Sequence, residues 1–278
     1  MEANKIKGPA KSIILPNGAE ITYAERGEQH EEVAICGAFY HHTFMPVVEG
    51  LAQRYHVYAV VMRFDGVTDQ KNSDGTTHWG NQWGKDVHDF AQALGIRKFH
   101  YIGKCHGTIP GWYLFKNHPE MLIDFCSFFL GPHTRPANSN EWASLLQGHD
   151  TSAMMRVALR KPETGLPKKM EEMASIGPNA GGPEVMTYGG YPEQLWRGDL
   201  EAIERDLRNA PVPVGYLFGS IDPLFKDHLD SNMRLWELTR GCHFTILQGE
   251  CHLMELDCPE RVVDEAFTFI DQAHKVYE

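Results

Sequence analysis

The segment Gly103-Lys104-Cys105-His106-Gly107 constrains the fold of this chain more than any other part of the sequence. It directly follows the apolar stretch 99–102 and directly precedes residues 108–117, whose pattern is typical of a helix. A G-x-C-x-G turn between a strand and a helix forces its central residue into a strained backbone conformation. Side chains two positions to either side would collide with the neighbouring strand and helix, so both positions require glycine. The sequence therefore predicts a sharp strand-turn-helix unit with a thiol at its apex.

Short apolar segments recur along the rest of the chain. Two strand-like runs, 12–15 and 20–24, flank Pro16-Asn17-Gly18, and this turn chemistry predicts a β-hairpin. Segments 33–36, 57–62 and 99–102 are rich in residues that favour strands and are nearly continuous in apolar character, as strands buried on both faces of a parallel sheet should be. Further strand-like segments follow at 123–130, 212–218 and 244–247.

Helical patterns separate these segments. Apolar side chains at positions 87, 90, 91 and 94 recur at helical spacing and predict one apolar face on a helix that ends at Gly95. A last helix is expected to begin near Pro259, because proline suits the first turn. Strands that alternate with helices indicate a mostly parallel sheet covered on both faces.

Residues 132–210 interrupt this alternation. They contain scattered glycine and proline and helix-like pieces at 141–147 and 195–207, but no strand-like run. An insertion at this point, between the sixth and seventh main strands, would cover the C-terminal edge of the sheet, where ligands bind in open α/β sheets. We therefore expect a core domain formed by residues 1–131 and 211–278, and a helical lid formed by residues 132–210.

Composition and charge exclude several classes of protein. The 278 residues suffice for one α/β domain with an insertion, and the net charge of −11 is spread without acidic blocks, which argues against nucleic acid as a partner. The polar segment 1–7 lacks the apolar core of a signal peptide, and no apolar run has the length of a membrane span. The six cysteines lack the spacing of a disulfide framework or a zinc site. We expect a cytoplasmic protein without membrane association, with reduced thiols and no metal.

An acid and a histidine follow two later strands. Asp222 comes directly after the seventh predicted strand, and His252 comes after the last one, so both lie at the sheet edge that carries Cys105. A thiol with a base and an orienting acid can attack a carbonyl carbon. An Asp-Pro pair such as Asp222-Pro223 also begins ordinary turns, but no acidic residue follows the sixth strand to compete for the role. An inert buried thiol is the alternative for Cys105, and the strand-turn-helix context favours a nucleophile.

The order nucleophile, acid, histidine, together with the turn around Cys105, resembles the α/β-hydrolase superfamily in its lid-bearing, single-domain branch. The resemblance covers nearly all of the chain and is least in the lid. It implies an α/β-hydrolase fold, with a mostly parallel eight-stranded sheet, helices on both faces and a helical lid. It also implies that Cys105 replaces the usual serine and that Asp222 and His252 complete a catalytic triad. The backbone N–H groups of Ala38 and His106 are the implied oxyanion donors.

The chain departs from the family pattern near the site. Cysteine in place of serine is uncommon in the family, although dienelactone hydrolases carry it. Cys36 replaces the histidine of the family's H-G motif, and the family's G-x-G-x-S-D loop is degraded at 64–69. Phe39, His41 and His42 stand in the oxyanion loop, where small residues are usual, so they are candidates to contact the substrate. The alternative for His41 and His42 is that they are solvated, as histidine pairs on loops more often are. Tryptophans, likewise, more often pack in the core than contact a substrate. The further candidates for substrate contact are Trp79, Trp142 and Leu253.

The resemblance implies a cysteine-dependent hydrolase that acts on a small or medium hydrophobic carbonyl compound. The candidate bonds are an ester, a lactone, a thioester or the C–C bond of a diketone, and none of them requires a cofactor. Proteins of the same architecture also include lyases, cyclases and cofactor-free dioxygenases, in which His252 would act as acid or base without an acyl-enzyme. A non-catalytic binding protein is a third interpretation, which fits three correctly ordered triad residues poorly.

Overall fold

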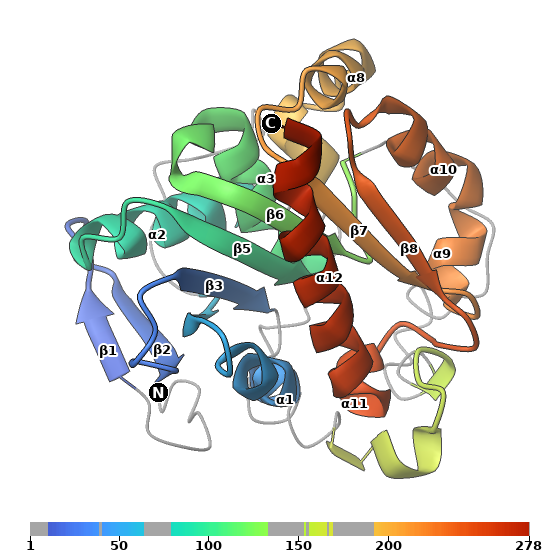
Figure 1. Ribbon diagram of the computed structural model, residues 1–278, viewed down its shortest axis with the longest axis horizontal. Helices are drawn as coiled ribbons and strands as arrows, with labels where there is room; N and C mark the ends of the chain where they lie inside the picture. The colour runs from blue at the N-terminus through green and yellow to red at the C-terminus, as the bar shows by residue number, and fades with distance from the viewer. Residues whose placement is uncertain are drawn as a thin grey trace.

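The computed structural model describes residues 11–38, 41–63, 79–132, 153, 156–165, 167–168 and 192–277. These residues form an eight-stranded sheet with the strand order β1-β2-β4-β3-β5-β6-β7-β8 (Figure 1). The strands are β1 (Lys11–Ile14), β2 (Glu20–Arg26), β3 (Val33–Ala38), β4 (His56–Val61), β5 (Phe99–Lys104), β6 (Leu122–Phe128), β7 (Val214–Gly219) and β8 (His243–Leu247). Each lies where the sequence predicts a strand.

The direction of the strands determines where the functional loops lie. The β1–β2 hairpin is antiparallel, as its turn predicts, and β2 is also antiparallel to β4. All the other neighbouring strands are parallel. Parallel strands end at the same edge of a sheet, so the residues that follow β3, β5, β6, β7 and β8 meet at one edge.

Helices cover both faces of the sheet. Among the described residues, apart from 153–168, the helices are α1 (His41–Leu51), α2 (Trp79–Ala93), α3 (Thr108–Asn117), α8 (Leu200–Arg208), α9 (Pro223–Asp227), α10 (Leu229–Leu238), α11 (Met254–Asp257) and α12 (Pro259–Tyr277), with the short 3₁₀ turns η1 (Cys105–Gly107), η2 (Pro119–Met121) and η3 (Pro192–Trp196). In Figure 1, α1 and α12 lie in front of the sheet, and α2 and α3 lie behind it. No helix among these residues combines the length and the apolar character needed to cross a membrane.

The sheet divides the buried core into two hydrophobic clusters. Tyr101 and Phe125 point into the cluster beneath α2, α3 and α8. Their chain neighbours Ile102 and Cys126 point into the cluster beneath α1 and α12. Side chains alternate in this way because successive residues of a strand face opposite sides of the sheet. The central strands are therefore buried on both faces, as their continuous apolar character predicts.

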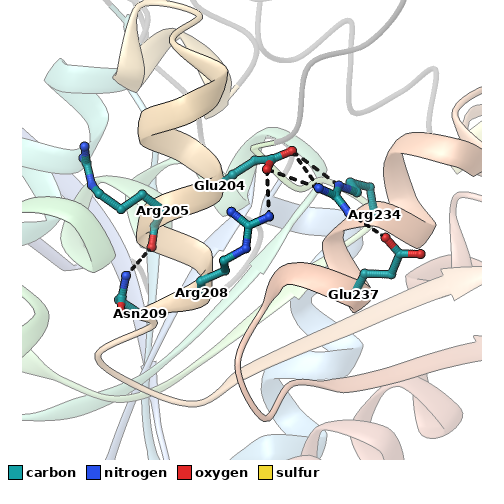
Figure 2. Close-up of polar contacts among 6 residues, drawn as sticks. All are labelled: Glu204, Arg205, Arg208, Asn209, Arg234 and Glu237. Atoms are coloured by element: carbon teal, nitrogen blue, oxygen red, sulfur yellow. Dashed lines mark hydrogen bonds and ion pairs between the residues drawn. The ribbon is translucent and has the colours of Figure 1, made fainter.

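The end of the stretch expected to form the lid packs against the core. Leu195 and Trp196 of η3, with Ile203 and Leu207 of α8, belong to the same buried cluster as α3. An ion pair also joins α8 to α10 (Figure 2): the Glu204 carboxylate lies 3.2 Å from the Arg234 guanidinium. Most of the remaining lid stretch, including the helix expected at 141–147, lies outside the described residues.

Candidate active site

Cys105 stands at a sharp turn between β5 and α3. Its φ angle is +52°, a left-handed conformation that residues with a Cβ atom rarely adopt. A Cβ atom on Gly103 would lie only 2.4 Å from the carbonyl oxygen of Gly107, so glycine is required at position 103. The Tyr101 hydroxyl donates a hydrogen bond of 2.8 Å to that same oxygen and holds the turn closed. The turn leaves the Cys105 side chain half-buried at the C-terminal edge of the sheet.

Asp222 orients His252 through a buried hydrogen bond. Nδ1 of His252 lies 2.9 Å from Oδ2 of Asp222, and the two residues are 3% and 0% exposed. The other carboxylate oxygen of Asp222 accepts a 2.8 Å hydrogen bond from the backbone N–H of Leu224 and caps α9. Since both carboxylate oxygens accept a hydrogen bond, the carboxylate is fixed before any substrate binds.

The loops that carry the acid and the histidine are joined through their backbones. The backbone N–H of Ile221 donates to the carbonyl oxygen of Glu250 at 3.0 Å. A Cβ atom on Gly219 would lie 2.3 Å from that same oxygen, so the close approach depends on glycine at this position. The sequence 248–253, here called the histidine loop, is therefore held directly against the residues that follow β7.

Two imidazoles surround the sulfur of Cys105. Nδ1 of His106 lies 3.3 Å from Sγ, and His252 also interacts with this sulfur. Burial of the thiol opposes its ionisation, but the two imidazoles outweigh this effect and lower the pKa of Cys105 well below its ordinary value. Burial would also lower the pKa of His252, yet Asp222 and then the Cys105 sulfur raise it to about 9. Near neutral pH these shifts favour a thiolate beside an imidazolium.

The other cysteines behave differently from Cys105. All six cysteines are free thiols. Burial raises the pKa of Cys36 and Cys126, and it raises the pKa of Cys251 to about 12. Burial likewise raises the pKa of Cys242 and Cys258. Only the thiolate is a strong nucleophile, and Cys105 is the one cysteine of the six whose surroundings lower its pKa.

The backbone places both expected oxyanion donors beside Cys105. Ala38 is the last residue of β3, and it pairs with Lys104 across the sheet. His106 follows Cys105 in η1.

Among the described residues, no group of three or more His, Cys, Asp or Glu side chains is arranged to hold a metal ion.

The residues expected to contact substrate have different surroundings. Trp79 begins α2, is buried in the cluster beneath α3, and lies 5.9 Å from the Trp83 ring between centroids. Leu253 follows His252 and is buried, and its backbone N–H donates to the Ala158 carbonyl at 2.9 Å. His41 and His42 begin α1. Phe39 and Trp142 lie outside the described residues.

The structure adds site residues that the sequence did not single out. The Phe129 ring packs 4.9 Å from the His252 ring between centroids, and its φ angle is +72°. Lys104 forms a buried ion pair with Glu255 of α11, with 2.6 Å between Nζ and Oε1. The position of Lys104 inside the Gly103–Gly107 turn was the only available signal, because a buried charge depends on a partner far away in the sequence.

No protein-family model and no curated protein matches this sequence. Solved structures do match, over almost the whole chain. The meta-cleavage product hydrolase from Pseudomonas fluorescens IP01 has a TM-score of 0.73 at 18% identity, over 95% of this chain and 98% of that one. The 2-hydroxy-6-oxo-6-phenylhexa-2,4-dienoate hydrolase from Rhodococcus sp. strain RHA1 has a TM-score of 0.70 at 15% identity, over 95% and 100%. The esterase RhEst1 from Rhodococcus sp. ECU1013 has a TM-score of 0.67 at 18% identity, over 95% and 99%. The chain therefore has the α/β-hydrolase fold that its motifs predict.

Proposed function

We propose that this protein is a cysteine-dependent hydrolase that cleaves a small or medium hydrophobic carbonyl compound through Cys105, His252 and Asp222. The observation that carries the proposal is a half-buried thiol that interacts with an imidazole, which a buried carboxylate orients at 2.9 Å. The similar solved structures include hydrolases of meta-cleavage products and an esterase, which supports an ester or C–C bond as the target. A cytoplasmic location remains a prediction of the sequence.

The reaction begins with a sulfur that is already ionised. The Cys105 thiolate attacks the carbonyl carbon, and the backbone N–H groups of Ala38 and His106 hold the negative charge that develops on the carbonyl oxygen. The His252 imidazolium then donates its proton to the leaving group, which departs and leaves a thioester on the sulfur. Asp222 stabilises the charged imidazole and keeps its ring oriented.

Hydrolysis of the thioester restores the resting state. His252, now neutral, removes a proton from a water molecule, and the resulting hydroxide adds to the thioester carbon. The acid is released, the sulfur leaves as a thiolate, and His252 keeps the proton that it took. All these steps use side chains and backbone of this chain, so the chemistry needs no cofactor.

In the proposed mechanism, His106 helps to keep the Cys105 sulfur ionised. Its imidazole lies 3.3 Å from the Cys105 sulfur, and it helps to lower the pKa of that thiol. A thiolate that stands ready before substrate binds does not require His252 to act first as a base. His252 is then available as the proton donor for the leaving group, which suits a poor leaving group such as the carbanion from a C–C bond.

Residues 132–210 are proposed to form the lid over this site. One described part of that stretch, residues 156–165, lies against the histidine loop. The Ala158 carbonyl accepts from Leu253, and the Arg160 guanidinium donates to the buried Glu250 carboxylate at 3.0 Å. These contacts support a lid whose base rests beside His252.

Replacement of the nucleophile tests the proposed function. With aryl esters, lactones and a vinylogous diketone as substrates, we expect Cys105→Ala to lower kcat/KM by at least about 10³-fold, because the covalent route is lost. The matched control is Cys242→Ala, which removes a partly exposed thiol outside the site and should retain wild-type turnover. Mass spectrometry of wild-type protein quenched during turnover should show the acyl group on Cys105. Undiminished turnover by Cys105→Ala, or turnover without any adduct, would instead assign acid-base chemistry to His252 alone.

A further inference from the structure

One buried ion pair joins the two parts of the chain that carry the reacting side chains. Lys104 directly precedes Cys105, and Glu255 follows His252 by three positions in α11. Nζ of Lys104 lies 2.6 Å from Oε1 of Glu255, and the two side chains are 8% and 1% exposed. The partners are 151 positions apart in the sequence, so no local element brings them together.

Burial of this pair is poorly explained by stability alone. Two charges lose their hydration when they are buried, and apolar residues of similar size often stabilise a protein as well or better. The pair has a second property, which is geometric. In a low-dielectric environment the attraction between the charges is strong, so it holds the two segments at one separation.

Phe129 supplies a second connection between the same groups. The Lys104 ammonium lies 5.9 Å from the centroid of the Phe129 ring, and that ring packs 4.9 Å from the His252 ring. The backbone N–H of Phe129 donates to the Leu217 carbonyl at 3.0 Å, which fixes the ring beside the end of β7. Lys104 is therefore connected to His252 in two ways: by its ion pair with Glu255, and by the Phe129 ring that packs against the imidazole.

We propose that Lys104 and Glu255 are positioning residues, which hold the Gly103–Gly107 turn and the histidine loop at the separation that keeps the Cys105 sulfur in contact with His252. The inference rests on the proposed function, because it concerns the same sulfur and imidazole. As a positioning residue, Lys104 does not contact the substrate. Its ammonium acts through the backbone of Cys105 on one side and through Glu255 and Phe129 on the other.

The proposed role of Lys104 is to hold the geometry of the site, not to change the charge of the sulfur. The two imidazoles, rather than the Lys104 ammonium, favour ionisation of the sulfur. If the ion pair is lost, the histidine loop moves away and the contact between the sulfur and His252 weakens. The pKa of Cys105 then rises toward that of a free cysteine, although His106 still lowers it. A displacement of about 1 Å is enough to slow an enzymatic reaction by about 10²-fold.

The test replaces the pair by apolar residues of similar size. We expect the double variant Lys104→Met/Glu255→Leu to fold, with a Tm within about 5 °C of the wild-type value, because no charge is left buried alone. The first measurement is the rate of Cys105 alkylation by iodoacetamide between pH 4 and pH 9. The midpoint of this profile should move by at least about one pH unit toward that of a free cysteine. With an ester that the wild type turns over, kcat should fall by about 10–100-fold and KM should change by less than about threefold.

A conservative change and a remote change serve as controls. Lys104→Arg keeps the charge, so it should recover most of the wild-type alkylation profile and kcat. Arg54→Met breaks the ion pair that Arg54, in the turn after α1, forms with Asp271 of α12, and it should change neither quantity. If the double variant does not fold, Glu255→Asp takes its place, since it keeps the charge but shortens the side chain. It should then show the same displacement of the profile.

The alkylation profile needs no substrate, so it tests the proposed function and the positioning role of the ion pair separately. If Cys105 of the wild-type protein titrates like a free cysteine, the proposed function fails together with this inference. If the wild type shows a thiolate near neutral pH, and a folded variant without the ion pair keeps that profile and kcat, only the positioning role is overturned.

Discussion

At the scale of single residues, Cys105 adopts a backbone conformation that its side chain disfavours. Its φ angle of +52° lies in the left-handed region, which costs about 1–2 kcal/mol for a residue with a Cβ atom. This strain projects the sulfur out of the turn toward His252. The strained backbone therefore lowers the stability of the fold at the position where the proposed reaction needs an accessible nucleophile.

Two substitutions that both remove the sulfur reveal this strain. We expect Cys105→Gly to be more stable than Cys105→Ala by about 1 kcal/mol, because only alanine retains the Cβ atom that disfavours a positive φ. Unfolding in urea, followed by circular dichroism, measures the difference. Both variants should be inactive, so any difference in stability is independent of catalysis. Greater stability of the alanine variant would mean that the turn relaxes once the sulfur is removed.

The sequence predicted these residues unequally. Cys105, Asp222 and His252 were predictable because each follows a recognisable strand, and because backbone contacts require glycine at position 103. Lys104 and Phe129 were not predictable. A lysine beside a turn is normally solvated, and a phenylalanine at the end of an apolar run is normally a core residue. Their roles depend on contacts between segments that are distant in the sequence.

At the scale of elements, the segment 156–165 is fastened to the histidine loop by charged contacts. The Glu250 carboxylate is fully buried and accepts from both Arg160 and Arg261. The Asp257 carboxylate accepts from the backbone N–H groups of Arg160 and Lys161 at 2.7 and 3.2 Å. The proposed lid and the histidine loop should therefore loosen together.

Arg160→Met tests this coupling. A hydrogen bond to a charged group contributes about 1.5–3 kcal/mol, so we expect the Leu253 amide, which donates to Ala158, to exchange its hydrogen at least about tenfold faster. Native-state hydrogen exchange measures this rate, and Tm should fall by only a few degrees. The control is Arg205→Met, which removes an exposed ion pair of α8. Equal effects of the two substitutions would show that the contact is ordinary surface pairing.

Elements were predictable where their pattern is local. The helix at 108–117 and all eight strands were predicted because hydrophobic periodicity and turn residues determine them. Helix α1 was not predicted. It begins at His41, within the expected oxyanion loop, and contains Pro46, which ordinarily interrupts a helix. Short helices such as α9 and α11 depend on capping and on packing of the neighbouring loops, neither of which has a clear signature in one sequence.

At the scale of the whole molecule, the opposite edge of the sheet carries a further buried histidine. His100, near the start of β5, is fully buried, and its Nδ1 lies 2.8 Å from Oδ2 of Asp124. Its Nε2 lies 3.0 Å from Oε1 of Glu32. Burial disfavours the charged imidazole, but the two carboxylates outweigh this effect and raise the pKa of His100 above its ordinary value. The contact links β5, β6 and the start of β3.

This cluster makes the stability of the molecule depend on pH. Because the pKa of His100 is higher in the folded state, its protonation stabilises the fold fully below about pH 6.5, and this contribution is lost as the pH rises through the folded value. We expect the difference in unfolding free energy between wild type and His100→Gln to be larger at pH 6 than at pH 9. Urea unfolding at pH 6 and at pH 9 measures this difference. Cys105 and His252 titrate equally in the two proteins, so their contributions cancel. Glu32→Gln should show a smaller difference of the same sign, and a difference that grows with pH would contradict the assignment.

The layered arrangement was predictable at this scale, since alternating strands and helices permit few other folds. The cluster around His100 was not, because His100 and Asp124 become neighbours only through the register of β5 on β6. The ion pair between Glu204 of α8 and Arg234 of α10 depends in the same way on the packing of two helices (Figure 2).

The distance of 151 positions between Lys104 and Glu255 has a consequence for biosynthesis. A ribosome releases the turn around Cys105 long before it releases β8 and α11. Until those segments arrive, the nascent chain holds Cys105 beside His106 but without His252, and Lys104 without Glu255. The proposed triad is thus complete only after the segment with His252 has been made, and a chain that stops short of β8 carries Cys105 without His252.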